Sequence, residues 1–357
     1  MLKVCLVGND YRQQFPIIDY GGIESCVENL AAGVYRYAKD KMKCYTFVPK
    51  IQNKGNITYP FPIIETNFIE SSKSHSPTYA FTDEVSNIIK NSPVKPDIIW
   101  AQSDWSAKGL KHLGIPIIST MNDSGGWVDD KFIYEPNVYY RFVSKFLYDF
   151  TFENSNTNSF INDVKSKSFW GHTGLVDEEY AFEGDKENYI LWVGGLHWGL
   201  EAKGLNMYIE MAKRRPDQIF KAYGTGDDNV EAYLKDIMKT VPNFKFMGKL
   251  NRGVDHKKVF QKARLFAMLS KIPEAFGRTG LEAISKGTPV LGTSYGSVPE
   301  QVFYNNVGYC TNDIDEMLKV IDMKFDYKAC YEFSNTYHIK NEVDFMIKKS
   351  NEILNRN

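Results

Sequence analysis

The sequence lacks the patterns that mark several common classes of protein. Its five cysteines are odd in number, widely spaced and free of any CxxC pair, so neither a disulfide framework nor a zinc site is expected. The N-terminal run MLKVCLVGND is too short for the core of a signal peptide and far too short to span a bilayer. With 43 basic and 44 acidic residues, the formal net charge of −1 gives no overall attraction to nucleic acid. We therefore expect a cytoplasmic protein that does not bind nucleic acid.

Signatures of metal and dinucleotide sites are missing as well. The histidines are scattered without ligand spacing, and the Asp-x-Asp motif, Asp313 and Asp315, stands where a helix N-cap is expected. No GxGxxG run follows the first strand, so a nicotinamide dinucleotide is not supported. We expect no metal and no cofactor.

What the chain does contain is an alternation of short apolar runs with longer amphipathic stretches, which is typical of parallel α/β sheets. A length of 357 residues favours two domains. A polar run over 181–188 separates two such series, so we place the domains at 1–185 and 186–335, followed by a C-terminal helix over 336–357. Expected strands cover 2–7, 44–48, 98–101, 115–120, 189–193, 219–223, 244–247, 265–269 and 290–293. Expected helices cover 21–39, 204–214, 230–240, 314–321 and 338–354.

The segment EAFGRTGLE, from Glu274 to Glu282, carries the strongest chemical signal. Two carboxylates lie on either side of a Phe-Gly pair, just before a helical run. A helix that begins near Gly277 would direct free backbone N–H groups toward the space between them, which suits an anion such as a diphosphate. We predict that this segment binds phosphate at one end and hydroxyl groups at the other.

This block, the apolar strand before it and the KGTPVLGT segment after it resemble the GT4 family of retaining glycosyltransferases. The resemblance implies the GT-B fold: α/β, with two facing Rossmann-like domains, parallel sheets and an interdomain cleft. It places Glu274 beside the donor sugar, Glu282 on the ribose hydroxyls, and the backbone of Gly277, Arg278 and Thr279 on the diphosphate. It also implies that the terminal helix returns to the first domain.

Two further segments match the family. Gly21 and Gly22 open the first helix within a GGxE loop, where small residues let the donor diphosphate approach; paired glycines also serve simply as tight turns. Lys203 matches a KG pair whose lysine contacts the donor phosphates and would stabilise the leaving diphosphate. Gly224 and the segment around Lys249 stand where backbone groups of the family meet the base and ribose.

Two positions depart from the family pattern. Gly195 stands where the family usually has an arginine, and Arg278, Arg12 and His197 are the candidates for the missing charge. Asn122 follows a strand where the family often has a histidine; it can position a substrate through its amide or simply form a turn with Asp123.

An aromatic and basic stretch over 132–152 has two interpretations. It is either a core helix of the first domain or, through Arg141 and Lys145, a surface for a membrane or an acceptor glycan.

Together these residues predict a hexosyltransferase that retains configuration, needs no metal, and moves a sugar from a nucleoside diphosphate to a hydroxyl of a glycan, lipid-linked or protein-linked acceptor. Glu274, Lys203 and Asn122 would take part in the reaction. Because of the two departures, a weak or inactive scaffold that binds a nucleotide sugar or glycan stays open. So does a nucleotide-sugar epimerase.

Overall fold

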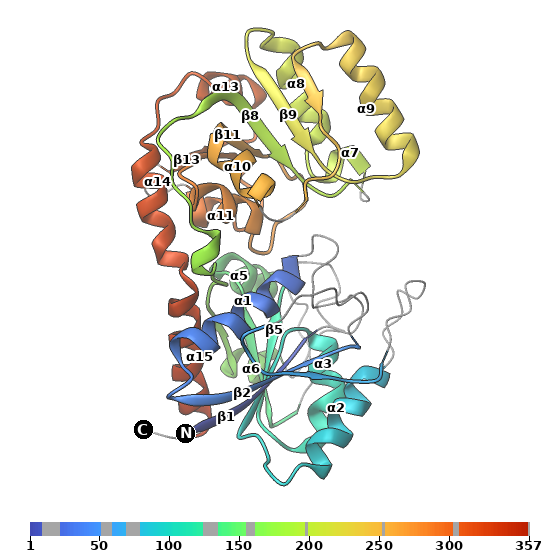
Figure 1. The fold of residues 1–357 in the computed structure, drawn as a ribbon, viewed down its shortest axis with the longest axis vertical. Coiled ribbons are helices and arrows are strands. Elements are labelled where there is room, and N and C mark those ends of the chain that lie inside the picture. The colour runs from blue at the N-terminus through green and yellow to red at the C-terminus, as the bar shows by residue number, and fades with distance from the viewer. Residues whose placement is uncertain are drawn as a thin grey trace. The chain divides into compact units, whose positions relative to one another are not determined.

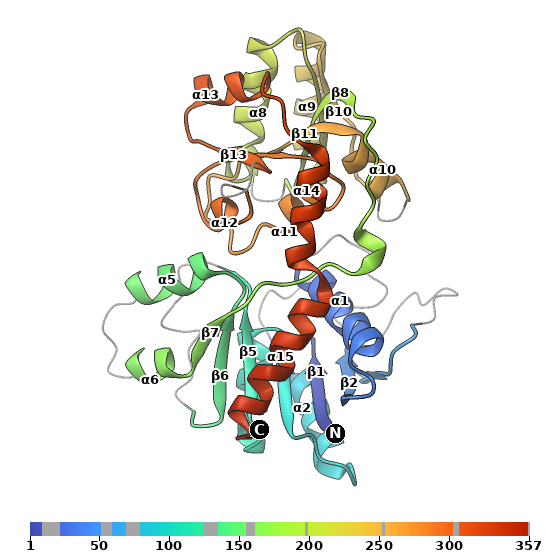
Figure 2. The ribbon, with the colours of Figure 1, turned by 90° about the vertical axis from the view of Figure 1, so that its left-hand side faces the viewer.

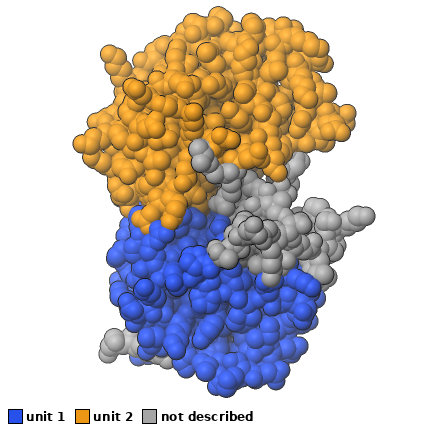
Figure 3. Space-filling view, in the orientation of Figure 1, with its two compact units in different colours: residues 1–176, 337–357 blue, residues 177–336 orange. Residues whose placement is uncertain are grey.

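The computed structural model describes residues 1–8, 22–50, 59–68, 79–123, 135–154, 161–196, 199–251, 254–302 and 307–355 (Figure 1). The chain forms two compact units, coloured separately in Figure 3: unit 1 comprises Met1–Val176 with Tyr337–Asn357, and unit 2 comprises Asp177–Thr336. The first change of unit therefore comes at Asp177 rather than at residue 186. The intervening residues pack on unit 2, where Ala181 N–H donates to Ser285 O over 3.3 Å.

Unit 1 is built on a seven-stranded sheet in the order β3-β2-β1-β4-β5-β6-β7. Its strands are β1 (Leu2–Val7), β2 (Met42–Val48), β3 (Ile63–Glu65), β4 (Ile98–Ala101), β5 (Ile117–Met121), β6 (Val138–Phe142) and β7 (Ser168–Trp170). Each adjacent pair is parallel. The order reverses direction between β1 and β4, and a ligand crevice is expected beyond the carboxyl ends of the strands at such a point.

Most described helices of unit 1 lie in the chain between two of its strands. They are α1 (Gly22–Tyr37), α2 (Ala80–Asn91), α3 (Asp104–Leu110), α5 (Lys145–Asn154), α6 (Ile161–Ser166) and α15 (Ile339–Ile353), with one 3-10 turn, η1 (Lys111–Leu113). A second turn, η3 (Asn335–Tyr337), lies where the chain re-enters this unit.

The C-terminal helix α15 packs against α1 within unit 1 (Figure 2). Ile339 and Val343 of α15 are fully buried in one cluster with residues of α1 and the sheet. Gly33 allows the close approach of the helices, because a Cβ there would lie 2.4 Å from Cγ1 of Ile339. Trp100 of β4 also donates from Nε1 to Ser350 Oγ of α15 over 3.0 Å.

A buried ion pair adds to this attachment. Nη2 of Arg141, in β6, lies 2.7 Å from Oε1 of Glu342 in α15, and both side chains are almost fully buried. Arg141 also donates to the carbonyl oxygens of Gly171 and His172, while Glu342 Oε2 accepts from Gly174 N–H at 2.6 Å. Because a buried charge is costly without a partner, these contacts make each residue depend on the other.

Unit 2 repeats the order of the first six strands of unit 1. Its six-stranded sheet runs β10-β9-β8-β11-β12-β13, with parallel neighbours and the reversal between β8 and β11. The strands are β8 (Glu187–Val193), β9 (Ile219–Tyr223), β10 (Phe244–Phe246), β11 (Ala263–Met268), β12 (Val290–Gly292) and β13 (Gly308–Cys310). The helices are α7 (Gly199–Ala202), α8 (Leu205–Arg214), α9 (Asp228–Thr240), α10 (Val254–Lys262), α11 (Arg278–Ile284), α12 (Val298–Val302), α13 (Ile314–Val320) and α14 (Tyr327–Ser334), preceded by the 3-10 turn η2 (Asp177–Glu179).

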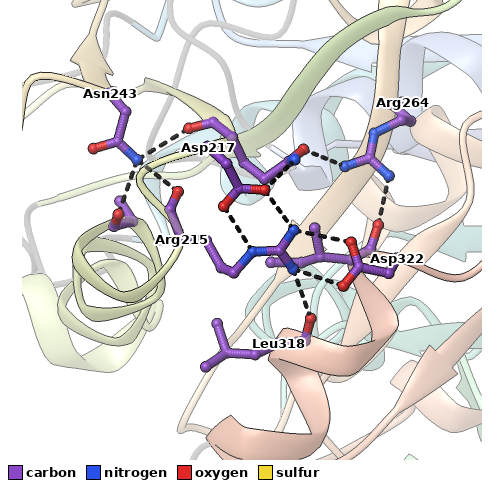
Figure 4. A network of polar contacts seen from close by, with 9 residues as sticks. Arg215, Asp217, Asn243, Arg264, Leu318 and Asp322 are labelled. Atoms are coloured by element: carbon purple, nitrogen blue, oxygen red, sulfur yellow. Dashed lines mark hydrogen bonds and ion pairs between the residues drawn. The ribbon is translucent and has the colours of Figure 1, made fainter.

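An arginine network joins elements of unit 2 near the start of β9 (Figure 4). The guanidinium of Arg215 lies between two carboxylates, with Nη2 2.7 Å from Asp217 Oδ2 and 2.9 Å from Asp322 Oδ1. Asn243 donates to the carbonyl oxygen of Arg215 at 2.9 Å. The network therefore links the turn after α8 to the end of α13, at the edge of the sheet opposite the carboxyl ends of the strands.

The α/β class with two parallel sheets is confirmed, and the predicted strands and helices shift by a few residues at most. One prediction was wrong: the stretch over 132–152 is not a single helix. Within its described part, Val138–Phe142 is the strand β6, and a helix begins only at Lys145. The aromatic side chains of this stretch fit either a helix or a strand, which explains the error. The predicted cap is confirmed, since Asp313 Oδ1 accepts from the N–H groups of Asp315 and Glu316.

Candidate functional site

The crossover point of unit 2 brings together two of the residues predicted from the sequence. Lys203 lies on the connection that follows β8, and Glu274 lies on the loop that follows β11, the neighbouring strand. Lys203 Nζ is 2.6 Å from Glu274 Oε1. The lysine side chain is 26% exposed and the glutamate 16%, so both remain within reach of a ligand.

The backbone around Lys203 is fixed by close packing. Gly204 has φ +70°, and a Cβ there would lie 1.9 Å from the carbonyl oxygen of Leu269. Trp192, at the end of β8, donates from Nε1 to the carbonyl oxygen of Lys203 at 3.0 Å. The glycine of the predicted KG pair thus lets the loop of Lys203 lie directly on the loop that leads to Glu274.

Glu274 is held by its backbone and by one side-chain oxygen. Its backbone forms a bridge with Gly296, and its carbonyl oxygen accepts from Ser297 N–H at 2.9 Å. Gly296 has φ +76°, and a Cβ there would lie 2.3 Å from Glu274 N. Ser270 donates to the same Oε1 that Lys203 contacts. Since the contacts found among the described residues fall on Oε1, Oε2 can accept a bond from a ligand hydroxyl.

The helix start predicted near Gly277 is confirmed. Helix α11 begins at Arg278, and Gly277 is its N-cap with φ +74°. A Cβ on Gly277 would lie 2.5 Å from Met268 Cε, so the tight turn over the end of β11 requires glycine. The N–H groups at the start of α11 therefore follow Glu274 directly.

The second carboxylate of the block, Glu282, is buried. Its side chain is 1% exposed; Oε1 lies 3.3 Å from Arg278 Nε and Oε2 lies 3.6 Å from His256 Nε2. Sequence reasoning missed His256, because nothing in the sequence places α10 beside α11. The burial of Glu282 means that a ribose could reach only the part of the carboxylate that faces away from these partners.

A buried lysine lies behind this carboxylate. Lys286 is fully buried, with Nζ 3.4 Å from Glu179 Oε2 and 3.1 Å from Ser285 Oγ. Burial lowers the pKa of Lys286, and the nearby Glu179 and Glu282 act in the opposite direction. Glu179 belongs to η2, so the residues at which unit 2 begins are attached to the end of α11.

Gly224 lies at the same edge of the sheet, after β9. Its N–H donates to Gly248 O at 2.9 Å, and Leu196 N–H donates to Thr225 O at 2.9 Å. These two bonds join the loops after β8, β9 and β10. The N–H of Gly224 is therefore already engaged, and a Cβ there would lie 2.3 Å from Gly194 O, which explains the glycine by packing.

The predicted residues of unit 1 lie at the carboxyl edge of its own sheet. Gly22 is the first residue of α1, and a Cβ there would have no atom within 4 Å, so packing does not account for this glycine. Asn122 follows β5 and donates from Nδ2 to Gln102 O at 2.8 Å. This bond ties the ends of β4 and β5 together and fixes the amide. Gly21 lies outside the described residues.

Three residues were candidates for the positive charge that is missing at Gly195, and the structure describes one of them. Arg278 is turned toward Glu282 and is 7% exposed. Arg12 and His197 lie outside the described residues. Among the described residues, no three His, Cys, Asp or Glu side chains gather in a group that could hold a metal ion.

The membrane interpretation of the aromatic stretch needs correction. Arg141 is fully buried against Glu342, so it cannot contact a membrane surface. Lys145, by contrast, is exposed and paired with Asp149, next to the stacked rings of Phe146 and Phe150 on α5. No helix in the described part of the chain is long and apolar enough to cross a bilayer.

Comparison with known proteins extends these observations. Residues 178–322, which include Lys203, Glu274 and Glu282, match the family model of glycosyl transferases group 1. No curated protein sequence matches the chain.

Solved structures share the fold over nearly the whole chain. A glycosyltransferase involved in avilamycin A biosynthesis has a TM-score of 0.70 at 16% identity, over 99% of this chain and 98% of its own. HepE of Anabaena, solved with UDP-glucose, has a TM-score of 0.69 at 13% identity, over 98% and 100%. The catalytic domain of starch synthase IV from Arabidopsis thaliana, bound to ADP and acarbose, has a TM-score of 0.71 at 12% identity, over 99% of both chains. At these identities the likeness shows the fold alone, which is GT-B.

Proposed function

Since the chain has the GT-B fold and residues 178–322 form a glycosyl transferases group 1 domain, we propose that it is a retaining, metal-independent hexosyltransferase of the GT4 type. In this proposal it moves a sugar from a nucleoside diphosphate to a hydroxyl of a glycan, a lipid-linked acceptor or a protein-linked acceptor. The observation that carries the proposal is the contact of Lys203 with Glu274 at the crossover point of unit 2.

Lys203 is suited to the leaving group. Its ammonium has three N–H donors, and the bond to Glu274 uses one of them. The remaining donors can bind diphosphate oxygens, whose negative charge grows as the glycosidic bond breaks. A fixed positive charge at that position stabilises the transition state more than the ground state.

Glu274 is suited to the sugar. Lys203 and Ser270 hold Oε1, so the carboxylate is oriented before a substrate arrives. Its Oε2 can accept from a sugar hydroxyl, and its position just before α11 puts that hydroxyl near the helix start. The backbone of Gly277, Arg278 and Thr279 would then bind the diphosphate, and Glu282 the ribose.

Gly22 and Asn122 are the proposed contributions of unit 1. The missing Cβ of Gly22 leaves room for a phosphate to approach the start of α1. The amide of Asn122 is held by Gln102, which leaves its Oδ1 to position a donor or acceptor hydroxyl. Both roles are proposals, and so is a contact of α5 with a membrane. The proposed site of action is the cytoplasm, where nucleotide sugars and free thiols coexist.

The stereochemical proposal follows from the resemblance to GT4 enzymes. There the leaving phosphate is thought to take the acceptor proton on the same face of the sugar, so no side chain acts as a covalent nucleophile. Under this mechanism, the role of Lys203 and the start of α11 in this chain is to hold the departing diphosphate.

A donor panel tests the function directly. The protein would be incubated with UDP-glucose and ADP-glucose, suggested by the ligands of the structural relatives, and with GDP-mannose, and release of nucleoside diphosphate would be measured with and without EDTA. We expect one donor to be consumed, with no loss in EDTA, and an anomeric configuration retained in the product by NMR. An inverted product, or loss of turnover in EDTA, would contradict the corresponding part of the proposal.

A scaffold that binds but does not turn over its ligand is the second candidate, because Gly195 lacks the charge that the family has there. Binding without hydrolysis or transfer would favour it. Conversion of one nucleotide sugar into its epimer would favour an epimerase instead.

A further inference from the structure

The carboxylate of Glu282 is held from two sides by residues of different elements. Arg278, one turn earlier in α11, places Nε 3.3 Å from Oε1. His256, in α10, places Nε2 3.6 Å from Oε2. Because Arg278 belongs to the same helix, it moves with Glu282, whereas His256 connects the carboxylate to a different helix, α10.

His256 is itself fixed by the core. Its side chain is 6% exposed, and its ring centroid lies 4.9 Å from that of Phe260, at an angle of 45°. Phe260 is fully buried and lies 5.2 Å from the ring of Phe266 in β11. The imidazole therefore has a defined place relative to β11, the strand that leads to Glu274.

The charges around the pair explain why a histidine is suitable here. Glu282 already faces Arg278, and Lys286 adds a second buried cation whose partner is Glu179. A third permanent charge, such as lysine at position 256, would be costly to bury. At 3.6 Å the imidazole contacts Oε2 without a hydrogen bond; a closer approach in the ligand-bound protein would let a neutral imidazole donate from Nε2 to Oε2 without adding charge.

This arrangement leaves a defined part of the carboxylate for a ligand. Oε2 of Glu282 is buried and has no hydrogen-bond partner among the described residues, so it is an acceptor that the protein alone leaves unused.

We propose that His256 is a positioning residue for nucleotide recognition: it orients Glu282 so that the carboxylate accepts from the ribose hydroxyls of the donor. The inference rests on the proposed function, because it assumes that a nucleoside diphosphate binds at α11. It adds a residue to which neither the sequence nor the comparisons assign a role.

The test compares nucleotides with and without ribose hydroxyls. Affinities for UDP, GDP and ADP, and for their 2′,3′-dideoxy counterparts, would be measured by calorimetry for wild type, His256→Phe, His256→Gln and Glu282→Gln. His256→Phe keeps a ring against Phe260 and removes the donor; His256→Gln keeps a donor. His112→Phe, in unit 1, is the matched control.

In wild type, the ribonucleotide should bind more tightly than its dideoxy counterpart. His256→Phe should lose about tenfold of this preference, as expected for one hydrogen bond to a charged group, and affinity for the dideoxy form should stay unchanged. His256→Gln should recover part of the preference, and His112→Phe should keep all of it. Adding His256→Phe to Glu282→Gln should cause no further loss.

Two results would overturn the inference, and they differ from each other. If wild type prefers the ribonucleotide and a folded His256→Phe protein prefers it equally, or binds both forms more weakly by the same factor, His256 does not position Glu282. If wild type binds none of the three nucleotides, the proposed function fails together with the inference. Melting curves without ligand show whether each variant is folded, and His256→Gln decides the question if His256→Phe is not.

Discussion

Nζ of Lys203 lies 2.6 Å from Oε1 of Glu274, although the two residues are on loops that follow different strands of the sheet. Neighbouring parallel strands end at the same edge, so the loops after β8 and β11 meet there. A cation and a carboxylate, each only partly exposed, thus stand together at the point where doubly wound sheets bind ligands.

The contact predicts a large catalytic effect of Glu274. The change Glu274→Ala should reduce transfer by about two to three orders of magnitude, as expected when a group that orients the reacting sugar is lost. The melting temperature should change little, because Lys203 stays in contact with solvent. Rates would be measured at saturating donor. Glu332→Ala, an exposed carboxylate of the same unit, should transfer at the wild-type rate; a similar rate for Glu274→Ala would remove that residue from the site.

The variant Gly22→Ala distinguishes a role of this glycine in packing from a role in binding the donor. Since a Cβ at this position meets no atom within 4 Å, Gly22→Ala should fold with unchanged or slightly higher stability. The methyl group should nevertheless hinder a diphosphate at the start of α1, and donor affinity should fall. Gly184→Ala, also in open space, is the control for both measurements. Unchanged donor affinity in Gly22→Ala would show that the glycine only forms a turn.

The buried pair of Arg141 and Glu342 predicts a stability effect without a catalytic one. Glu342→Gln leaves the guanidinium buried without its charge partner, which should destabilise unit 1 by about 3–5 kcal/mol. Lys340→Met breaks an exposed pair on the same helix and should cost at most about 1 kcal/mol. Urea unfolding would compare the two variants. Equal midpoints would mean that the pair does not fasten α15 to unit 1.

The lowered pKa of Lys186 predicts that the free energy of unfolding depends on pH. Burial lowers the pKa of Lys186 to about 8, from an ordinary value of 10.5, while Nζ donates to Gln261 O at 2.7 Å and to Thr288 Oγ1 at 2.9 Å. The unfolded chain therefore holds this proton more tightly than the folded protein does. The resulting cost is fully present below pH 8 and is relieved as the pH rises toward 10.5.

A comparison with Lys186→Met isolates this effect. Between about pH 7 and pH 10, the unfolding free energy of wild type should rise relative to that of the variant. Other groups that titrate in this range are common to both proteins and cancel in the difference. Denaturant curves at several pH values would measure it, and parallel dependences would refute the assignment.

The sequence was sufficient where local pattern decides structure. The fully buried run Ile98–Ala101 is a central strand, as its unbroken apolar residues predict, and Gly277 caps α11 because only a residue with positive φ fits there. The contact of Lys203 with Glu274 could also be anticipated, because each follows a strand and the strands pair.

What the sequence could not predict depends on distant parts of the chain. The β-strand Val138–Phe142 has aromatic residues that suit either a helix or a strand, and only its pairing with β5 and β7 decides. The partners His256 and Glu282 come together because α10 packs on α11, and Arg141 meets Glu342 because α15 lies in unit 1. The spacing of residues along the sequence gives no information about contacts between such distant segments.

Calorimetric binding of UDP-glucose, ADP-glucose and GDP-mannose to wild type and to Lys203→Met tests the central claim most directly. The account predicts that wild type binds at least one of these donors and that Lys203→Met, still folded, binds it about tenfold or more weakly, since a charge-assisted bond to the diphosphate is lost. Equal affinities in the two proteins, or no binding by wild type to any of the three, would contradict it.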